Sequence, residues 1–245
     1  GNFLLQWGSL GTGPGQLWFP WGIDCDAAGN VYVSDLDNYR IQKFTGSGQF
    51  LKQWGSNGTG PGQWSNAPFL AIDELDQVYL GDGVNRRIQK FDSNGNLLEV
   101  WDTPDFAARG MAAAGGRVFA VDGIQSQIRV FDTHGNVQGT FGSEGYGYGQ
   151  LYRPWDVEPD DAGNLYVTSV NDYRLTKFSP IYDVLAQWGT VGTGPGQFGD
   201  EQAVYVHPNH LVYVVDRIHG RVEVFEVGAV PASIVSWGAI KVNYR

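Results

Sequence analysis

Short runs of alternating apolar and polar residues, bounded by Gly, Asn and Asp, follow one another along most of the chain. Val31, Val33 and Ile41 show this alternation, and no stretch keeps the spacing of an amphipathic helix. β-Branched and aromatic residues fill these runs, which is typical of strands. The pattern predicts an all-β protein.

The predicted strands recur as an internal repeat. Equivalent segments end in an aromatic residue, and the spacings between these residues are 47, 47, 40, 47 and 49 for Trp7, Trp54, Trp101, Phe141, Trp188 and Trp237. Periods of this length indicate propellers or solenoids. Five complete copies of the repeat are present.

Each repeat is predicted to contain four strands, which in the first copy cover residues 22–26, 30–34, 40–45 and 50–54. Gly29 and Gly163, and the pair Asn94 and Gly95, stand where tight antiparallel turns need a positive φ. Four-stranded antiparallel sheets repeated at this period are the blades of a β-propeller.

The run Asp35-x-x-Asn38-x-Arg40-Ile41-Gln42-Lys43-Phe44, followed by the Gly-rich stretch 55–63, resembles the NHL repeat. The resemblance covers nearly the whole chain and implies an NHL-type β-propeller. Similar propellers serve as protein or RNA binding platforms, as extracellular sensor domains and, in related groups, as lyases or lactonases, so the resemblance does not by itself assign a function.

Strand counting predicts five blades. Residues 3–7 repeat the outer-strand pattern and are expected to pair with the third strand of the last repeat, near residues 221–225, which would close the propeller. The propeller is then residues 1–228, and residues 229–245 are a C-terminal tail. A six-bladed propeller, whose sixth blade begins in residues 233–245, is the alternative.

Composition narrows the possible partners. The net charge of −10 and the acidic pI of about 4.7 disfavour nucleic acid, whose binding depends on Lys and Arg. No stretch approaches the ~18 apolar residues of a membrane span, so membrane insertion is not expected. The single cysteine, Cys25, allows no disulfide within the chain. We expect an extracellular or periplasmic location.

Three sets of residues could suggest catalysis, phosphate binding or metal binding, but a structural role explains each set better. The pairs Asp35/Arg40, Asp82/Arg87 and Asp216/Arg221 recur, whereas a catalytic group is needed once, so we expect structural ion pairs; Gln127 and Ser169 interrupt the pattern in the third and fourth repeats. The Gly-rich crossover loops open no helix, so phosphate binding is not expected. The histidines at 134, 207, 210 and 219 form no apparent metal site, so no metal, cofactor or catalytic residue is predicted.

Large side chains stand where each crossover loop delivers the chain to an inner strand. Repeat alignment places Trp21, Phe69, Arg109, Trp155 and Gln202 at this position, with Tyr39 and Tyr173 expected on the same face. Aromatic rings beside an Arg suit sugars or extended peptides. These seven residues are the candidate ligand-binding site; the structural alternative is that some of the rings pack between loops.

The sequence therefore favours a non-enzymatic binding or scaffold propeller, with a protein, carbohydrate or peptide ligand on the aromatic face. Two alternatives stay open at this point. One is an extracytoplasmic lyase or lactonase, and the other is a structural subunit of a larger assembly.

Overall fold

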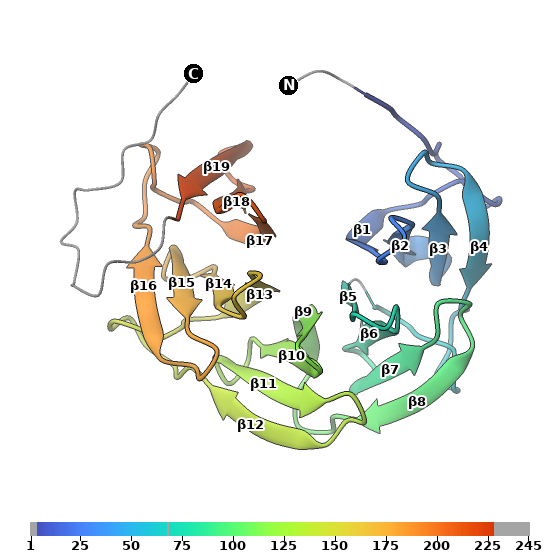
Figure 1. Ribbon diagram of the computed structural model, residues 1–245, viewed down its shortest axis with the longest axis horizontal. Coiled ribbons are helices and arrows are strands. Elements are labelled where there is room, and N and C mark those ends of the chain that lie inside the picture. The colour runs from blue at the N-terminus through green and yellow to red at the C-terminus, as the bar shows by residue number, and fades with distance from the viewer. Residues whose placement is uncertain (1–3, 68, 228–245) are drawn as a thin grey trace. The chain divides into compact units, whose positions relative to one another are not determined.

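A computed structural model describes residues 4–67 and 69–227, and this part of the chain is all-β (Figure 1). Its regular structure consists of nineteen strands and one 3-10 helix, η1 (Leu36–Asn38). The strands form five sheets in which each strand pairs with the next along the chain. The all-β prediction is confirmed, and the predicted four strands are present in the first four sheets, while the described part of the fifth sheet has three.

The first two sheets are β1 (Pro20–Cys25), β2 (Val31–Asp35), β3 (Arg40–Phe44) and β4 (Phe50–Trp54), and then β5 (Phe69–Ile72), β6 (Val78–Asp82), β7 (Arg87–Phe91) and β8 (Leu97–Asp102). The third and fourth are β9 (Ala108–Ala114), β10 (Arg117–Asp122), β11 (Gln127–Asp132) and β12 (Val137–Phe141), and then β13 (Pro154–Pro159), β14 (Leu165–Ser169), β15 (Arg174–Phe178) and β16 (Val184–Trp188). The last comprises β17 (Glu201–His207), β18 (Leu211–Asp216) and β19 (Arg221–Glu226).

The turns between strands have the predicted glycine conformations. Gly29 has φ 78° and donates its N–H to the carbonyl of Asp26, and Gly95 has φ 77° and donates to Asp92. An L-residue rarely adopts this φ, so glycine at these two positions permits the tight reversal.

Second strands are buried on both faces. Every residue of β2, β6 and β14 is buried, although each strand ends in small or polar residues. In the first sheet, Tyr32 belongs to the apolar cluster shared with the second sheet, while Val31 and Val33 pack beneath Trp7 and Leu17. A strand in the middle of a blade therefore contacts a neighbour on each side, which explains its depth of burial.

The described chain divides into two compact units. The first contains residues 1–120 and 130–138, and the second contains residues 121–129 and 139–245. Apolar clusters join successive sheets within the first unit, for example Ile41 with Leu80 and Phe91. In the second unit, Tyr166 and Leu175 pack with Val214 and Phe225 in the same way.

The strand predicted for residues 3–7 is not formed in the described part of the chain. Leu4 to Trp7 belong to no strand, and the last sheet consists of β17, β18 and β19. Trp7 instead packs its ring on Phe44 of the first sheet, at 6.3 Å between ring centroids. Closure through residues 3–7 stays a prediction, and the proposed tail at 229–245 lies outside the described residues.

Candidate aromatic binding site

Two of the predicted site residues, Trp21 and Phe69, are brought together by the first two sheets. Their ring centroids lie 6.4 Å apart in an edge-to-face arrangement, and Phe19 lies 5.9 Å from Trp21 on its other side. Phe19 and Trp21 are 56% and 42% exposed, while Phe69 is half-buried. These three residues are called the aromatic cluster below.

The local backbone explains why these rings reach solvent. Phe19 has φ 58°, in the left-handed region, and the pairing of β1 with β2 shifts register between Pro20 and Ile23. Such an irregularity bends a strand and redirects its side chains. Phe19, just before β1, and Trp21, in its first residues, therefore reach solvent instead of pointing into the core.

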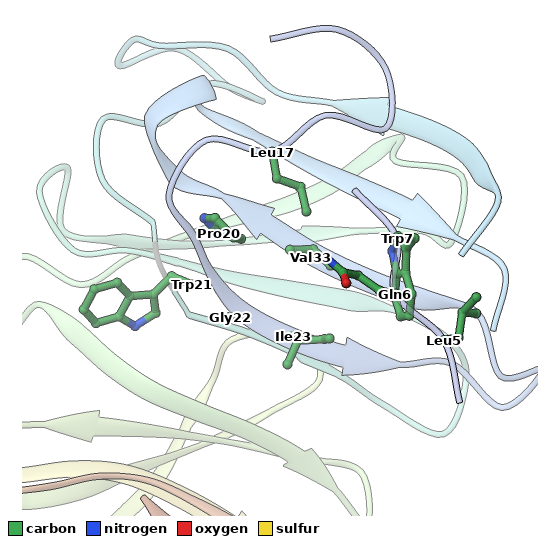
Figure 2. A pocket seen from close by; sticks show the side chains of 9 residues that line it. All are labelled: Leu5, Gln6, Trp7, Leu17, Pro20, Trp21, Gly22, Ile23 and Val33. Atoms are coloured by element: carbon green, nitrogen blue, oxygen red, sulfur yellow. The ribbon is translucent and has the colours of Figure 1, made fainter. Parts of the chain in front are cut away.

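An apolar pocket of about 470 Å³ opens beside the cluster (Figure 2). Figure 2 shows Trp21 at one end of the pocket and Leu5 and Trp7 at the other. The first sheet and the segment before β1 supply the lining. Its nine residues are Leu5, Gln6, Trp7 and Leu17 from that segment, Pro20, Trp21, Gly22 and Ile23 from β1, and Val33 from β2. Such a pocket suits an apolar side chain of a ligand.

Tyr39 and Tyr173 have a packing role in the structure. Both have a left-handed backbone, with φ 53° and 58°. Tyr39 packs against the cluster shared by the first two sheets, and Tyr173 packs against the cluster of the fourth and fifth sheets. Both are half-buried, and contact with a ligand stays a prediction for them.

The remaining three predicted residues lie on inner strands. Arg109 is a half-buried residue of β9 in the first unit. Trp155 is a half-buried residue of β13 and Gln202 belongs to β17, both in the second unit, and the side chain of Gln202 lies outside the described part. A single face that joins all of these residues stays a prediction.

Sequence reasoning missed several residues of the site. Phe19, Leu5 and Ile23 were not singled out, although they are 56%, 47% and 63% exposed. The available signal was the run of residues 18–21, in which three aromatic rings surround one proline. The crossover residue Trp64, by contrast, is 1% exposed and belongs to the core.

The recurring Asp and Arg residues form the predicted buried ion pairs. Arg40 Nε donates to Asp35 Oδ2 at 2.7 Å, and Arg87 Nε donates to Asp82 Oδ2 at 3.0 Å. The Arg40 guanidinium also donates to the carbonyls of Thr12, Gly13 and Gln16, which belong to the crossover loop before β1. Each pair thus anchors a crossover loop to its sheet, which is a structural task.

The third and fourth repeats, in which the Asp/Arg pattern is interrupted, hold their arginines in different ways. In the third sheet Gln127 occupies the Arg position, and Arg129, two residues further on, supplies the guanidinium that pairs with Asp122 at 3.2 Å. In the fourth sheet Ser169 replaces the Asp, and Arg174 donates to the carbonyl of Tyr146 at 2.7 Å. The fourth sheet therefore retains the Arg without its carboxylate.

Two inner-strand carboxyls have a raised pKa. Desolvation raises the pKa of Asp24 to about 6 and that of Asp156 to about 7, in the range used for general acid or base catalysis. Asp24 accepts hydrogen bonds from the N–H groups of Cys25 and Ile72, and Asp156 accepts from Val157 and Val204. In each case both oxygens hold backbone N–H groups of two successive sheets, so the carboxyl links inner strands.

The Gly-rich crossover loops are stabilised by their own glutamines. In the first two loops Gln16 Oε1 accepts from Gly13 N at 2.9 Å, and Gln63 Oε1 accepts from Gly60 N at 3.1 Å. The loops are therefore compact turns stabilised by side-chain to backbone bonds.

Within the described residues, no three His, Cys, Asp or Glu side chains gather in a way that could hold a metal ion.

Consecutive antiparallel sheets, each a meander of neighbouring strands, define an all-β protein of the β-propeller class, with five blades in the described part of the chain. Residues 17–44 match the NHL repeat, the repeat that the sequence resembles. NHL repeat-containing protein 3 of Mus musculus is 34% identical over 95 residues. That similarity covers 37% of this chain and 27% of the mouse protein, so this chain spans little more than a quarter of that relative.

Solved structures share the fold at low sequence identity. A streptogramin B lyase has a TM-score of 0.65 at 11% identity, over 86% of this chain and 69% of that one. A chain of a nidogen/laminin complex has a TM-score of 0.66 at 16% identity, over 86% and 77%. These likenesses include a lyase and a component of a protein complex, so they establish the propeller fold alone. Among the described residues, no helix has the length and apolar character to cross a membrane.

Proposed function

We propose that this propeller is a non-enzymatic binding module whose protein partner docks on the aromatic cluster and inserts an apolar side chain into the adjacent pocket. The observation that carries the proposal is the exposure of Phe19 and Trp21 in mutual contact. Exposed rings held by neighbouring rings lose little conformational freedom on binding, and Trp is enriched among residues that dominate binding energy.

The lining of the pocket supports a peptide or protein ligand over a sugar. Leu5, Leu17, Ile23 and Val33 supply aliphatic surface, and Gln6 is the polar side chain of the lining. A sugar needs several hydrogen-bonding groups placed around a ring, whereas an apolar side chain gains free energy from the area that it buries. The ligand class proposed is therefore an extended peptide segment with a large apolar residue.

A binding role is also supported by the state of the buried carboxyls. Asp24 and Asp156 have pKa values suited to proton transfer, but each uses both oxygens to bind backbone N–H groups. A general acid or base must reach the substrate with a free oxygen. Their hydrogen bonds favour a structural role over the lyase or lactonase alternative.

The proposal is tested by selecting ligands from a random peptide library displayed on phage, followed by calorimetric titration of the selected peptides. We expect Trp21→Ala to weaken binding by at least 2 kcal/mol, about thirtyfold. Trp18→Ala is the matched control, because Trp18 is 49% exposed but does not line the pocket.

Thermal unfolding of each variant shows whether it is folded. Equal loss of affinity in the two Trp variants, or selected peptides that bind the Trp21 variant normally, would show that the aromatic cluster is not the docking site.

A further inference from the structure

One turn of the fourth sheet departs from a hydrogen-bond network that two other sheets share. In the first sheet Asn38 Nδ2 donates to Asp35 Oδ2 at 2.8 Å and to the carbonyl of Gly11 at 3.0 Å. In the second sheet Asn85 Nδ2 donates to Asp82 and to Gly58 at 2.8 and 3.1 Å. The amide thus fastens the crossover loop to the turn that follows the second strand.

The fourth sheet exchanges the two polar residues of this network. Ser169 stands at the Asp position, and Asp172 stands at the Asn position. Asp172 is 7% exposed and Ser169 is fully buried. Both carboxyl oxygens of Asp172 and the hydroxyl of Ser169 are buried without a hydrogen-bond partner in the structure. A carboxylate lacks the N–H groups of the amide, so the ionised side chain cannot replace the Asn donor.

The groups around Asp172 do not neutralise it. Arg174 is the cation that acts on it, but the Arg174 guanidinium donates to the carbonyls of Tyr146 and Gly147 and to Gln187. The phenol of Tyr146 also interacts electrostatically with Asp172, and its ring centroid lies 4.8 Å from that of Tyr152. Burial raises the pKa of Asp172 to about 7, although Arg174 lowers it in part.

The crossover loop beside this turn has the same scaffold as the other Gly-rich loops. Gln150 Oε1 accepts from Gly147 N at 2.8 Å, as Gln16 Oε1 does from Gly13 N in the first loop. Glu144 and Leu151 form an isolated parallel β-bridge, which the other Gly-rich loops also contain. The difference lies in two side chains. Tyr146 and Tyr148 are 60% and 69% exposed where the other three Gly-rich loops have Thr and Pro.

We propose that Asp172 is a proton-controlled latch of the crossover loop 142–150. In its neutral form the carboxyl O–H takes the role of the Asn amide and donates to the carbonyl of Gly145, which precedes Asp172 by the 27 residues that separate Gly11 from Asn38. Loss of the proton removes this donor and places a charge beside a carbonyl oxygen. The loop then loosens, and the presentation of Tyr146 and Tyr148 changes.

Hydrogen exchange of the wild-type protein, measured by mass spectrometry and corrected for intrinsic exchange rates, tests the latch. Between pH 6 and pH 8 the neutral fraction of a group with a pKa near 7 falls about tenfold. We expect the protection of residues 142–152 to fall by up to the same factor. The loop at residues 55–63 is the internal control, because Asn85 fastens it at every pH.

The decisive variant is Asp172→Asn, which restores the residue of the first two sheets. It is expected to keep residues 142–152 protected at both pH values. If this variant folds poorly, the double variant S169D/D172N, which restores both network positions, takes its place. Equal protection of the wild-type loop at both pH values, or a pH dependence that persists in the variant, would overturn the proposal. Calcium that restores protection at pH 8 would overturn it as well, since Asp172 would then be a cation ligand.

Discussion

The indole of Trp54 lies against Gly95, so closely that a Cβ atom on Gly95 would stand 2.5 Å from Trp54 Cδ2. Gly95 belongs to the turn between the third and fourth strands of the second sheet, and Trp54 ends the outer strand of the first. Trp7 meets Gly48 in the same way, and Trp101 meets Gly135. In the first unit, a Trp that rests on the glycine turn of the sheet that follows it is therefore a repeated contact.

The Trp54 contact predicts that Gly95→Ala destabilises the protein by about 2–4 kcal/mol, because the new methyl group overlaps the indole and φ is 77°. Gly62→Ala is the matched control. Gly62 has φ 73°, but a Cβ there would meet nothing within 4 Å, so strain of about 1 kcal/mol is expected. Urea denaturation measures both changes. Equal losses would mean that backbone strain, and not the Trp contact, requires glycine at position 95.

Arg40 is expected to be irreplaceable by lysine. Its guanidinium binds Asp35 and the crossover carbonyls at once, and a lysine ammonium cannot reproduce this planar set of donors. We expect Arg40→Lys to cost about 3 kcal/mol, since breaking a buried pair leaves a carboxylate poorly compensated. Arg86→Lys, at an exposed residue that donates to the carbonyl of Pro104, should change the free energy of unfolding by less than about 1 kcal/mol. A similar cost for both variants would contradict the anchoring role.

Trp7 is expected to stabilise the first sheet even though residues 4–7 form no strand. Its ring covers Phe44 and packs with Leu17 and Phe50 against the face of that sheet. Trp7→Ala should therefore lower stability by about 2–4 kcal/mol. Leu4→Ala, at a side chain that is 91% exposed, should have an effect within about 0.5 kcal/mol. A melting temperature that Trp7→Ala leaves unchanged would show that this contact contributes little.

Stability is expected to peak near pH 4. Hydrogen bonds lower the pKa of carboxyls such as Asp26, to about 2 despite a burial effect in the other direction, so their contribution is lost as pH falls below about 4. Asp24, Asp156 and Asp172 have raised pKa values of about 6 to 7, so the folded state binds more protons than the unfolded state. Stability therefore falls as pH rises from about 4 to 7.

Urea denaturation across this range measures the pH profile. Asp172→Asn should flatten the loss above pH 5, because the amide has no proton to release. A profile that rises steadily from pH 5 to pH 8 would show that these three carboxyls are not held neutral.

Much of the fold follows from local features of the sequence. Turns such as those at Gly29 and Gly95 depend on a few adjacent residues, and the Asp35/Arg40 pair depends on two residues of one hairpin. Both features can therefore be recognised in the sequence of the repeat. The contact between Trp21 and Phe69, which are 48 residues apart, could also be predicted from the sequence. Residues at the same position of successive repeats lie at the same place in successive blades. Alignment of the repeats therefore predicts that such residues are neighbours.

Other properties were decided by the tertiary structure. Phe19 reaches solvent because a left-handed residue and a register shift begin β1, whereas Tyr39, also left-handed, packs inward against the next sheet. The exchange at Ser169 and Asp172 is visible in the sequence, but the isolation of the carboxyl is not. Exposure and protonation depend on which groups approach from other strands and loops, and the distances between those groups are set only when the sheets pack.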